Sequence, residues 1–332
     1  MPDSPDTQPD LETLSISNFH SAAQKAQIQH AAQAIVRGFP IDTQEAYRVL
    51  IEVVKHGLAE FEVLEPHLFA QNGSSRRMQA FHQALRQEYA QVRNILDSAP
   101  PGLVDRFEGP LLNDARPTWL QGKSKKSEIV VVFLTAFNNF YLSNLVLSLM
   151  LLEAGYSVLL LKSPRNSQFL NGIPGFGPDW ARSARGLQGF LAEKGCDYRI
   201  TGFSSGGYAG LLATLSISAP VFVGFSVCSD LRPDSPLSPQ LLFNEQVRGN
   251  TPPALHRNLA QDALTHKGYM RILVGALDGN DMQHAAALRE APGADVIIVP
   301  DEGHTIIRPL FLNGTLCTEM LHSPGAGYAD RM

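Results

Sequence analysis

The chain has 332 residues, of which 44% are hydrophobic and 18% are charged; this composition is typical of a folded globular protein and excludes extended disorder. The formal net charge of -5 predicts no basic surface, so a nucleic-acid partner is not expected. The three cysteines lie far apart and form neither a Cys-x-x-Cys pair nor an even disulfide set, which predicts reduced thiols.

The N-terminal sequence predicts a cytoplasmic protein. Its first residues, MPDSPDTQPDLETLS, are acidic and polar, without the cationic start and apolar core of a secretory signal. The longest apolar run, IVVVFLTAF at 129–137, is much shorter than a membrane span. We therefore expect residues 1–17 to form a disordered tail and the chain to have no membrane span.

Residues 18–100 are predicted to form an all-α module of roughly three helices. Apolar residues recur at three and four positions through HAAQAIVRGF, DTQEAYRVLIEVVKHGLAEF and SSRRMQAFHQALRQEYAQVRNIL. Asp42 or Thr43 is suited to cap the second run. The apolar stripe of that run comprises Ala46, Val49, Leu50, Val53, Val54 and Leu58. Such a module is suited to homodimer formation, to shielding a pocket or to docking a protein partner.

Residues 101–126 are interpreted as a linker, after which the pattern becomes that of a parallel sheet. Six short runs are apolar throughout and rich in β-branched residues, as in strands buried on both faces: 128–135, 157–162, 198–203, 220–227, 269–275 and 295–300. Helical patterns separate these runs, which predicts right-handed crossovers and a doubly wound, mostly parallel sheet. We expect this α/β domain over 127–325, followed by a tail at 326–332.

The stretch TGFSSGGYAG lies where a predicted strand gives way to a predicted helix. A nucleophile on such a turn is strained, and the residues two before and two after it must be small because strand and helix pass closely. Gly202 and Gly206 meet this requirement around Ser204. Choosing Ser205 would place Phe203 at a position that must be small. Ser204 is therefore the candidate nucleophile, and the Ser205 N–H is a candidate oxyanion donor.

A serine hydroxyl needs a base, and the base needs an acid that orients it. His304 follows the last predicted strand at the same sheet edge and is expected to be the base. The run ALDGND after the preceding strand offers Asp278 and Asp281. We expect Asp278 to be the acid because it lies close to the strand end. Asp281 remains the alternative, for which the role of a helix N-cap competes.

The loop LTAFNNFYLSN after the first strand of the domain is expected to supply a second oxyanion donor. Phe137 or Asn138 offers a backbone N–H, and Asn138 or Asn139 offers a side-chain donor. A turn that caps the next helix accounts for the two asparagines equally well. No metal and no other cofactor is expected.

Other residues near this edge have two interpretations each. Arg232, after the strand at 220–227, is placed either to hold an anionic group or to form an ion pair with Asp230. Six aromatic residues are candidates for a pocket wall, although core packing accounts for some of them: Phe137, Phe140, Tyr141, Phe169, Phe176 and Trp180.

The segments GFSSGG, VGALDGND and DEGHT, with the alternating strands of residues 127–322, resemble the nucleophile elbow, acid loop and histidine loop of the α/β-hydrolases. This resemblance implies acyl transfer from an ester, thioester or amide to the serine, then usually to water. No HGGG or His-Gly motif follows the first strand, and the segment 229–268 is short and polar, which disfavours a large lid.

These observations predict a serine hydrolase that acts on a small or medium ester or thioester, a small-molecule acyl substrate, through Ser204, His304 and Asp278. One alternative is an acyltransferase on the same triad, in which an alcohol or amine replaces water. The other is a hydrolase-like scaffold that binds a ligand or partner without turnover.

Overall fold

The computed structural model describes residues 22–39, 41–73, 75–99, 117–135, 140–163, 167–237 and 242–324. These residues fall into two compact units. The first takes the described residues up to 99 together with Leu142–Val146, and the second takes the rest. The expected tails at 1–17 and 326–332 lie outside the described residues, as does most of the expected linker.

Residues 22–99 of the first unit contain one helix more than the sequence pattern predicts. The helices are α1 (Ala22–Val36), α2 (Thr43–Lys55), α3 (Phe61–Asn72) and α4 (Arg76–Asp97). Helix α2 begins as expected, because the Asp42 carboxylate accepts hydrogen bonds from two backbone N–H groups of its first turn. The helix that the pattern misses is α3, which carries Pro66 in its interior. Proline normally ends a helix, so this stretch does not resemble one in sequence.

The apolar stripe predicted for α2 is confirmed as the core of this unit. All six of its residues are buried, and Leu50, Val53 and Val54 have no exposed surface. They pack in one cluster with apolar side chains of the other three helices, including Ile28, Leu64 and Leu85.

A polar cluster is buried beside that core. His82 of α4 has no exposed surface, and its Nδ1 atom lies 2.6 Å from Oε1 of Glu65 on α3. Its Nε2 atom lies 2.9 Å from the hydroxyl of Tyr47 on α2. Arg86 also pairs with Glu65, at 3.0 Å. One connected polar network therefore joins three helices.

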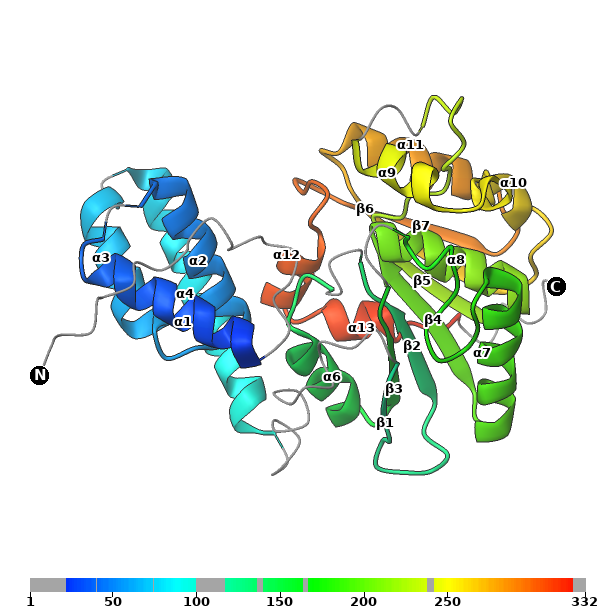
Figure 1. Cartoon of the computed structure of the whole chain (residues 1–332), viewed down its shortest axis with the longest axis horizontal. Coiled ribbons are helices and arrows are strands. Elements are labelled where there is room, and N and C mark those ends of the chain that lie inside the picture. The colour runs from blue at the N-terminus through cyan, green and yellow to red at the C-terminus, as the bar shows by residue number, and fades with distance from the viewer. Residues whose placement is uncertain are drawn as a thin grey trace, which may run out of the picture. The chain divides into compact units, whose positions relative to one another are not determined.

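The second unit contains a seven-stranded sheet in the order β1-β3-β2-β4-β5-β6-β7 (Figure 1). Its strands are β1 (Thr118–Leu120), β2 (Ile129–Phe133), β3 (Ser157–Leu161), β4 (Tyr198–Phe203), β5 (Val221–Phe225), β6 (Tyr269–Gly275) and β7 (Ala294–Val299). Strands β2 to β7 pair in parallel, and only β1 pairs antiparallel, with β3. The predicted doubly wound, mostly parallel sheet is confirmed. Strand β1 lies within the expected linker 101–126, where three residues are too few to show a period.

Helices cover both faces of this sheet, which is why β2 and β3 are buried along their whole length. Helix α8 packs on β2, β4 and β5, and α11 packs on β6 and β7. In Figure 1, α7 and α8 lie on one face and α6 and α13 on the other. The helical elements are α6 (Asn144–Glu153), α7 (Trp180–Lys194), α8 (Ser205–Ile217), α9 (Leu242–Asn250), the 3₁₀ turn η4 (Pro253–Leu255), α10 (Leu259–Ala263), α11 (Gly279–Leu288), α12 (Ile307–Leu312) and α13 (Leu316–Met320).

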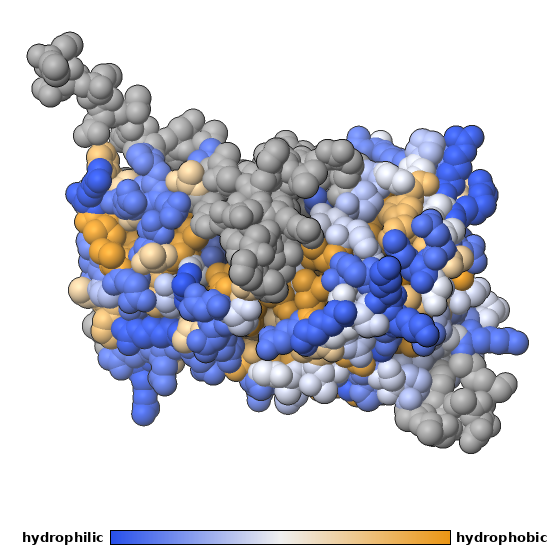
Figure 2. Space-filling model, turned by 90° about the horizontal axis from the view of Figure 1, so that it is seen from below, coloured by the Kyte–Doolittle hydropathy of each residue, from blue (hydrophilic) through white to orange (hydrophobic). Residues whose placement is uncertain are grey.

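The described residues bear on two expectations, which concern membrane-spanning helices and the state of the cysteines. Their helices are all too short or too polar to cross a membrane. The three cysteines are free thiols, as expected. On the face seen in Figure 2, hydrophilic side chains are spread over the surface between smaller hydrophobic areas.

Candidate active site

Strand β4 and helix α8 meet at Ser204, the candidate nucleophile. Its backbone has φ 53° and ψ -119°, a conformation that residues with a side chain rarely adopt. The N–H of Ser204 donates to the carbonyl of Phe225 at the end of β5 (2.9 Å), and its carbonyl accepts from the N–H of Gly207 (2.9 Å). Backbone bonds on both sides therefore hold the strained turn at the carboxyl edge of the sheet.

Two glycines allow this turn to be so tight. A Cβ atom on Gly202 would lie 2.4 Å from the carbonyl oxygen of Gly206. A Cβ atom on Gly206 would lie 2.3 Å from the carbonyl oxygen of Phe133 at the end of β2. Both distances are far below ordinary contact, so only glycine fits at either position. The small residues that the sequence places around Ser204 thus let α8 start directly against the sheet.

The loop after β7 brings His304 to Ser204, as the sequence predicts. The Nε2 atom of His304 lies 2.9 Å from the Oγ atom of Ser204. The ring of Phe203 lies 5.4 Å from the imidazole, between their centroids, and lines one side of it. The His304 side chain is 41% exposed, so a molecule from solvent can reach it.

The acid beside His304 is Asp281, and the expectation that favoured Asp278 is not met. The Nδ1 atom of His304 lies 2.7 Å from Oδ2 of Asp281, whose side chain is only 6% exposed. Asp278 is instead the N-cap of α11, and its carboxylate accepts hydrogen bonds from the N–H groups of Asn280 and Asp281. The expected roles of the two aspartates are exchanged because α11 begins at Gly279, one residue after Asp278.

These contacts assign the protons of the imidazole. A carboxylate only accepts hydrogen bonds, so Nδ1 of His304 carries the hydrogen that Asp281 accepts. In the neutral ring Nε2 then has a free electron pair and accepts the hydroxyl hydrogen of Ser204. Burial lowers the pKa of His304, but the hydrogen bond to Asp281 and the charges of Asp281 and Asp278 outweigh it, so this pKa lies above its ordinary value.

Backbone strain is concentrated at this edge of the sheet. Among the described residues, the non-glycine positions with positive φ are Tyr141, Gln168, Phe169, Ser204, Ser218, Ser226 and Asp301. All but Ser218 follow the carboxyl end of a parallel strand. Strained residues persist where the surrounding structure fixes them, and they cluster at functional sites. The candidate site thus lies at the edge of the sheet where most of these strained residues, Ser204 among them, follow a strand.

The expected oxyanion donors are only partly described. Ser205 is the first residue of α8, and a helix start directs backbone N–H groups and a partial positive charge outward. The positive end of this helix therefore lies beside Ser204. Phe137, Asn138 and Asn139 lie outside the described residues.

Four of the six aromatic candidates for a pocket wall belong to the protein's own packing. Phe140, Phe169 and Trp180 are buried, and Phe176 packs against the hydrophobic core. Of the two interpretations of Arg232, the ion pair is the one observed, because its guanidinium bonds to the buried carboxylate of Asp230 at 2.8 Å.

Two buried polar residues near the site were not found from the sequence. His284 lies one turn after Asp281 on α11 and is buried, and its Nδ1 atom accepts the N–H of Ser229 at 3.2 Å. Ser226 was placed within a strand predicted to run to 227, whereas β5 ends at Phe225. The one sequence signal at Ser226 is a small polar residue near a strand end, which many serines share.

The described residues contain one cluster of three possible metal ligands, formed by Asp278, Asp281 and His304. One ligand-type atom of each lies within 4.8 Å of those of the other two. Such a cluster can in principle hold a metal ion. Here Asp281 and His304 bond to each other, and the Asp278 carboxylate caps α11. These hydrogen bonds account for the cluster, and we assign no metal to it.

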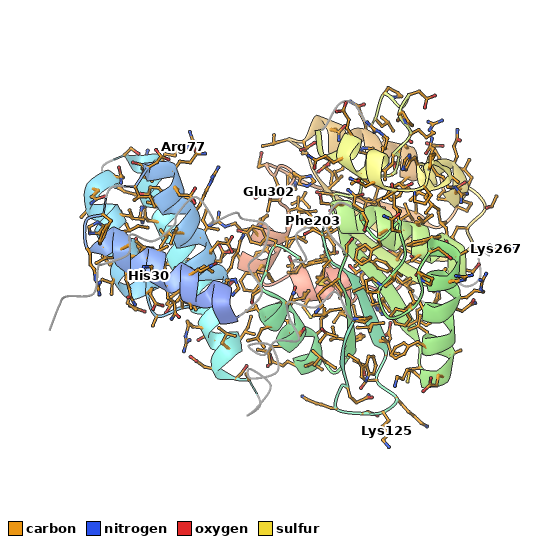
Figure 3. The ribbon with its side chains drawn as sticks, viewed as in Figure 1. His30, Arg77, Lys125, Phe203, Lys267 and Glu302 are labelled. Atoms are coloured by element: carbon orange, nitrogen blue, oxygen red, sulfur yellow. The ribbon has the colours of Figure 1, made fainter. Side chains whose placement is uncertain are left out.

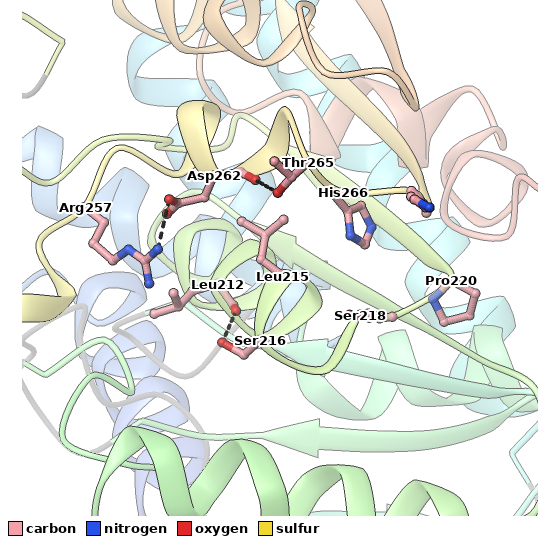
Figure 4. A pocket seen from close by; sticks show the side chains of 12 residues that line it. Leu212, Leu215, Ser216, Ser218, Pro220, Arg257, Asp262, Thr265 and His266 are labelled. Carbon is pink, nitrogen blue, oxygen red and sulfur yellow. Dashed lines mark hydrogen bonds and ion pairs between the residues drawn. The ribbon is translucent and has the colours of Figure 1, made fainter. Parts of the chain in front are cut away.

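A groove of about 720 Å³ lies away from this site (Figure 4). Its lining includes Pro220, which precedes β5, and Lys267, which precedes β6. None of its lining residues belongs to the group of Ser204, His304 and Asp281. Figure 3 shows the two edges, with Phe203 and Glu302 near the candidate site and Lys125 and Lys267 on the side where strands begin.

No protein-family model matches the sequence, and no curated protein matches it. Solved structures that resemble it are α/β-hydrolases. A hormone-sensitive lipase from a metagenome library has 16% identity and a TM-score of 0.46, over 60% of this chain and 77% of that one. Est1E from Butyrivibrio proteoclasticus has 12% identity and a TM-score of 0.45, over 60% of this chain and 90% of that one.

A monoacylglycerol lipase from Paleococcus ferrophilus has 14% identity and a TM-score of 0.43, over 63% of this chain and 100% of that one. At such identities the likeness concerns the fold alone. The activity has to be inferred from the residues of the site itself.

Proposed function

We propose that this protein is a serine hydrolase that cleaves a small or medium ester or thioester through an acyl-enzyme on Ser204. The observation that carries the proposal is the continuous series of short contacts from Ser204 through His304 to Asp281, at 2.9 and 2.7 Å. A serine without such a base is not nucleophilic at neutral pH. A buried acid, an imidazole and a serine on a strained turn form the arrangement that acyl transfer needs.

In the first step, Oγ of Ser204 attacks the acyl carbon while its proton passes to Nε2 of His304. The carbonyl electron pair moves onto oxygen, and this oxyanion accepts a hydrogen bond from the N–H of Ser205, the first residue of α8. The tetrahedral intermediate then expels the alcohol or thiol, which takes the proton from Nε2. Water attacks the acyl-enzyme in the same way, which releases the acid and restores Ser204.

Asp281 has two tasks in this mechanism. Its hydrogen bond to Nδ1 fixes the tautomer whose Nε2 faces Ser204. Its charge also stabilises the imidazolium that forms when Nε2 takes the serine proton.

The test is turnover of a panel of p-nitrophenyl esters and acyl thioesters of increasing chain length by the full chain. We expect hydrolysis that is lost in Ser204→Ala and in His304→Ala and retained in Ser216→Ala. Ser216 is a matched control because it is an exposed serine of the same helix α8. Equal turnover by Ser204→Ala and the unmodified protein would reject the acyl-enzyme.

The acceptor decides between hydrolysis and transfer. The same panel is repeated with a small alcohol and a small amine present, and the products are identified by mass. Release of free acid at the unchanged rate supports a hydrolase, whereas formation of a new ester or amide at the expense of acid makes the protein an acyltransferase on the same residues.

A further inference from the structure

Residues at the end of strand β5 bond to the nucleophile turn, to strand β6, which precedes the helix of Asp281, and to the histidine loop. The carbonyl of Phe225 accepts the N–H of Ser204 at 2.9 Å, which ties β5 to the nucleophile turn. The N–H of Ser226 donates to the carbonyl of Leu273 on β6 at 2.8 Å, and β6 precedes α11, whose first turn carries Asp281. The hydroxyl of Ser226 donates to the carbonyl of His304 at 2.8 Å. Two consecutive residues thus connect nucleophile, acid strand and histidine loop.

Ser226 is held in an unusual state to make these contacts. It has φ 46°, in the left-handed region that a serine rarely occupies, and it is 1% exposed. A hydroxyl buried so completely needs a hydrogen-bond acceptor, which is the carbonyl of His304. The same carbonyl also accepts the N–H of Ile306 at 3.0 Å. The backbone of His304 is therefore held from two directions.

The histidine loop is fastened on its other side by the end of β6. The N–H of Leu277 donates to the carbonyl of Glu302 at 2.8 Å. A Cβ atom on Gly275 would lie only 2.1 Å from the carbonyl oxygen of Gly303, so the loop lies directly against β6. By contrast, the His304 side chain is 41% exposed, so burial alone does not fix the ring. Its position depends on its backbone and on Asp281.

We propose that Ser226 is a positioning residue for the acyl-transfer reaction, whose hydroxyl holds the backbone of His304 so that the imidazole spans Ser204 and Asp281. This inference rests on the proposed function of the site. Ser226 itself is too deeply buried to touch a substrate, so its effect passes through His304.

The test uses Ser226→Gly in the full chain, with Ser226→Ala as a second variant. Glycine adopts φ 46° without strain, so Ser226→Gly removes the hydroxyl and leaves a backbone that the fold accepts. Thr201→Val is the matched control. The Thr201 hydroxyl is fully buried and donates to the carbonyl of Val223 on β5 at 2.8 Å, but it contacts no part of the triad.

The first readout is the rate at which a fluorophosphonate modifies Ser204, followed by intact mass. We expect a rate about tenfold lower in Ser226→Gly, because small displacements of a catalytic base are costly. Modification should still reach one adduct per chain. This end point would show that every molecule is folded and reacts more slowly, and that the lower rate does not come from an unfolded fraction. Ester KM should stay unchanged while kcat falls. A wild-type rate in Ser226→Gly, or an equal loss in Thr201→Val, would overturn the proposal.

The second readout does not depend on catalysis. The His304 imidazole is titrated by NMR in the unmodified protein and in Ser226→Gly. The charged groups that face it are Asp281 and Asp278. If the hydroxyl positions His304 against Asp281, its pKa falls toward the ordinary histidine value in the variant. An unchanged pKa rejects the positioning role, even in a protein whose serine proves unreactive and whose proposed function therefore fails.

Discussion

His304 bonds through Nδ1 to Asp281 at 2.7 Å, while Asp278, three residues earlier, caps the helix that carries Asp281. The two carboxylates therefore have separate tasks that depend on each other. Asp278 fixes the first turn of α11 through the N–H groups of Asn280 and Asp281. The position of this first turn sets the direction from which the Asp281 side chain meets the imidazole of His304.

This division of tasks predicts that replacing aspartate by asparagine lowers kcat strongly at position 281 and only slightly at position 278. Asp281→Asn keeps the size of the side chain but removes the charge and the acceptor-only oxygen that fixes the tautomer, so kcat should fall by about 10³-fold to 10⁴-fold. Asp278→Asn should keep kcat within about threefold, because asparagine caps helices as well as aspartate does. Steady-state kinetics on the best ester of the panel provides the measurement.

A third variant separates the cap from the charge. Asp278→Ala removes the cap and should lower the free energy of unfolding by about 1 kcal/mol, measured by urea denaturation. If Asp278→Asn lost as much activity as Asp281→Asn, the assignment of Asp281 as the acid would be wrong.

The pH dependence of the reaction follows from the raised pKa of His304. Only the neutral imidazole accepts the serine proton, so kcat/KM should fall as pH drops through this pKa. The acidic limb should therefore lie above the ordinary histidine value of about 6.5. Removing the Asp281 charge destabilises the imidazolium, so in Asp281→Asn the limb of the residual activity should move to lower pH. A limb that stays in place, or moves upward, would contradict the electrostatic role given to Asp281.

The glycines of the nucleophile turn predict a strong steric effect. Gly206→Ala would place a methyl group 2.3 Å from the Phe133 carbonyl oxygen, which forces α8 away from β2. We expect a loss of several kcal/mol in the free energy of unfolding, or no folded protein. Gly189→Ala in α7 is the control, because nothing lies within 4 Å of the added Cβ. It should stabilise the fold by about 0.5 to 1 kcal/mol in the same denaturation experiment.

The polar cluster of the helical unit predicts a stability effect remote from the site. Glu65→Leu removes the carboxylate that bonds to Nδ1 of the fully buried His82, leaving that group unpaired. The free energy of unfolding of this unit should fall by about 3 kcal/mol, measured by calorimetry. Glu45→Leu, at the surface pair of Glu45 and Arg48, should change it by no more than about 0.5 kcal/mol. Similar losses in the free energy of unfolding at both positions would indicate that the buried cluster stabilises the helical unit no more than a surface ion pair does.

Much of the fold could be predicted from the sequence, because its strongest signals are local. The parallel strands are short, apolar and bounded by turn residues, and β4 and β6 have the predicted bounds. The position of Ser204 was also predictable, since the need for small neighbours at two fixed offsets is a steric rule that residue types alone satisfy or violate.

What the sequence did not reveal depends on where elements begin and end. In ALDGND, a helix start shifted by three residues would exchange the cap and the acid, and residue types alone do not fix that start. Ser226 was hidden for the same reason, because its role depends on β5 ending at Phe225 and not two residues later. Helix α3 was missed because Pro66 lies inside it, where packing against the neighbouring helices overrides the propensity of proline.

The central claim is that Ser204 is an activated nucleophile, and the most direct measurement is intact-mass detection of a fluorophosphonate adduct, with the modified residue located by peptide mapping. The account predicts one adduct per chain, on Ser204, absent in Ser204→Ala and strongly slowed in His304→Ala. An adduct on another residue, or a folded protein that stays unmodified by fluorophosphonates of several sizes, would contradict it.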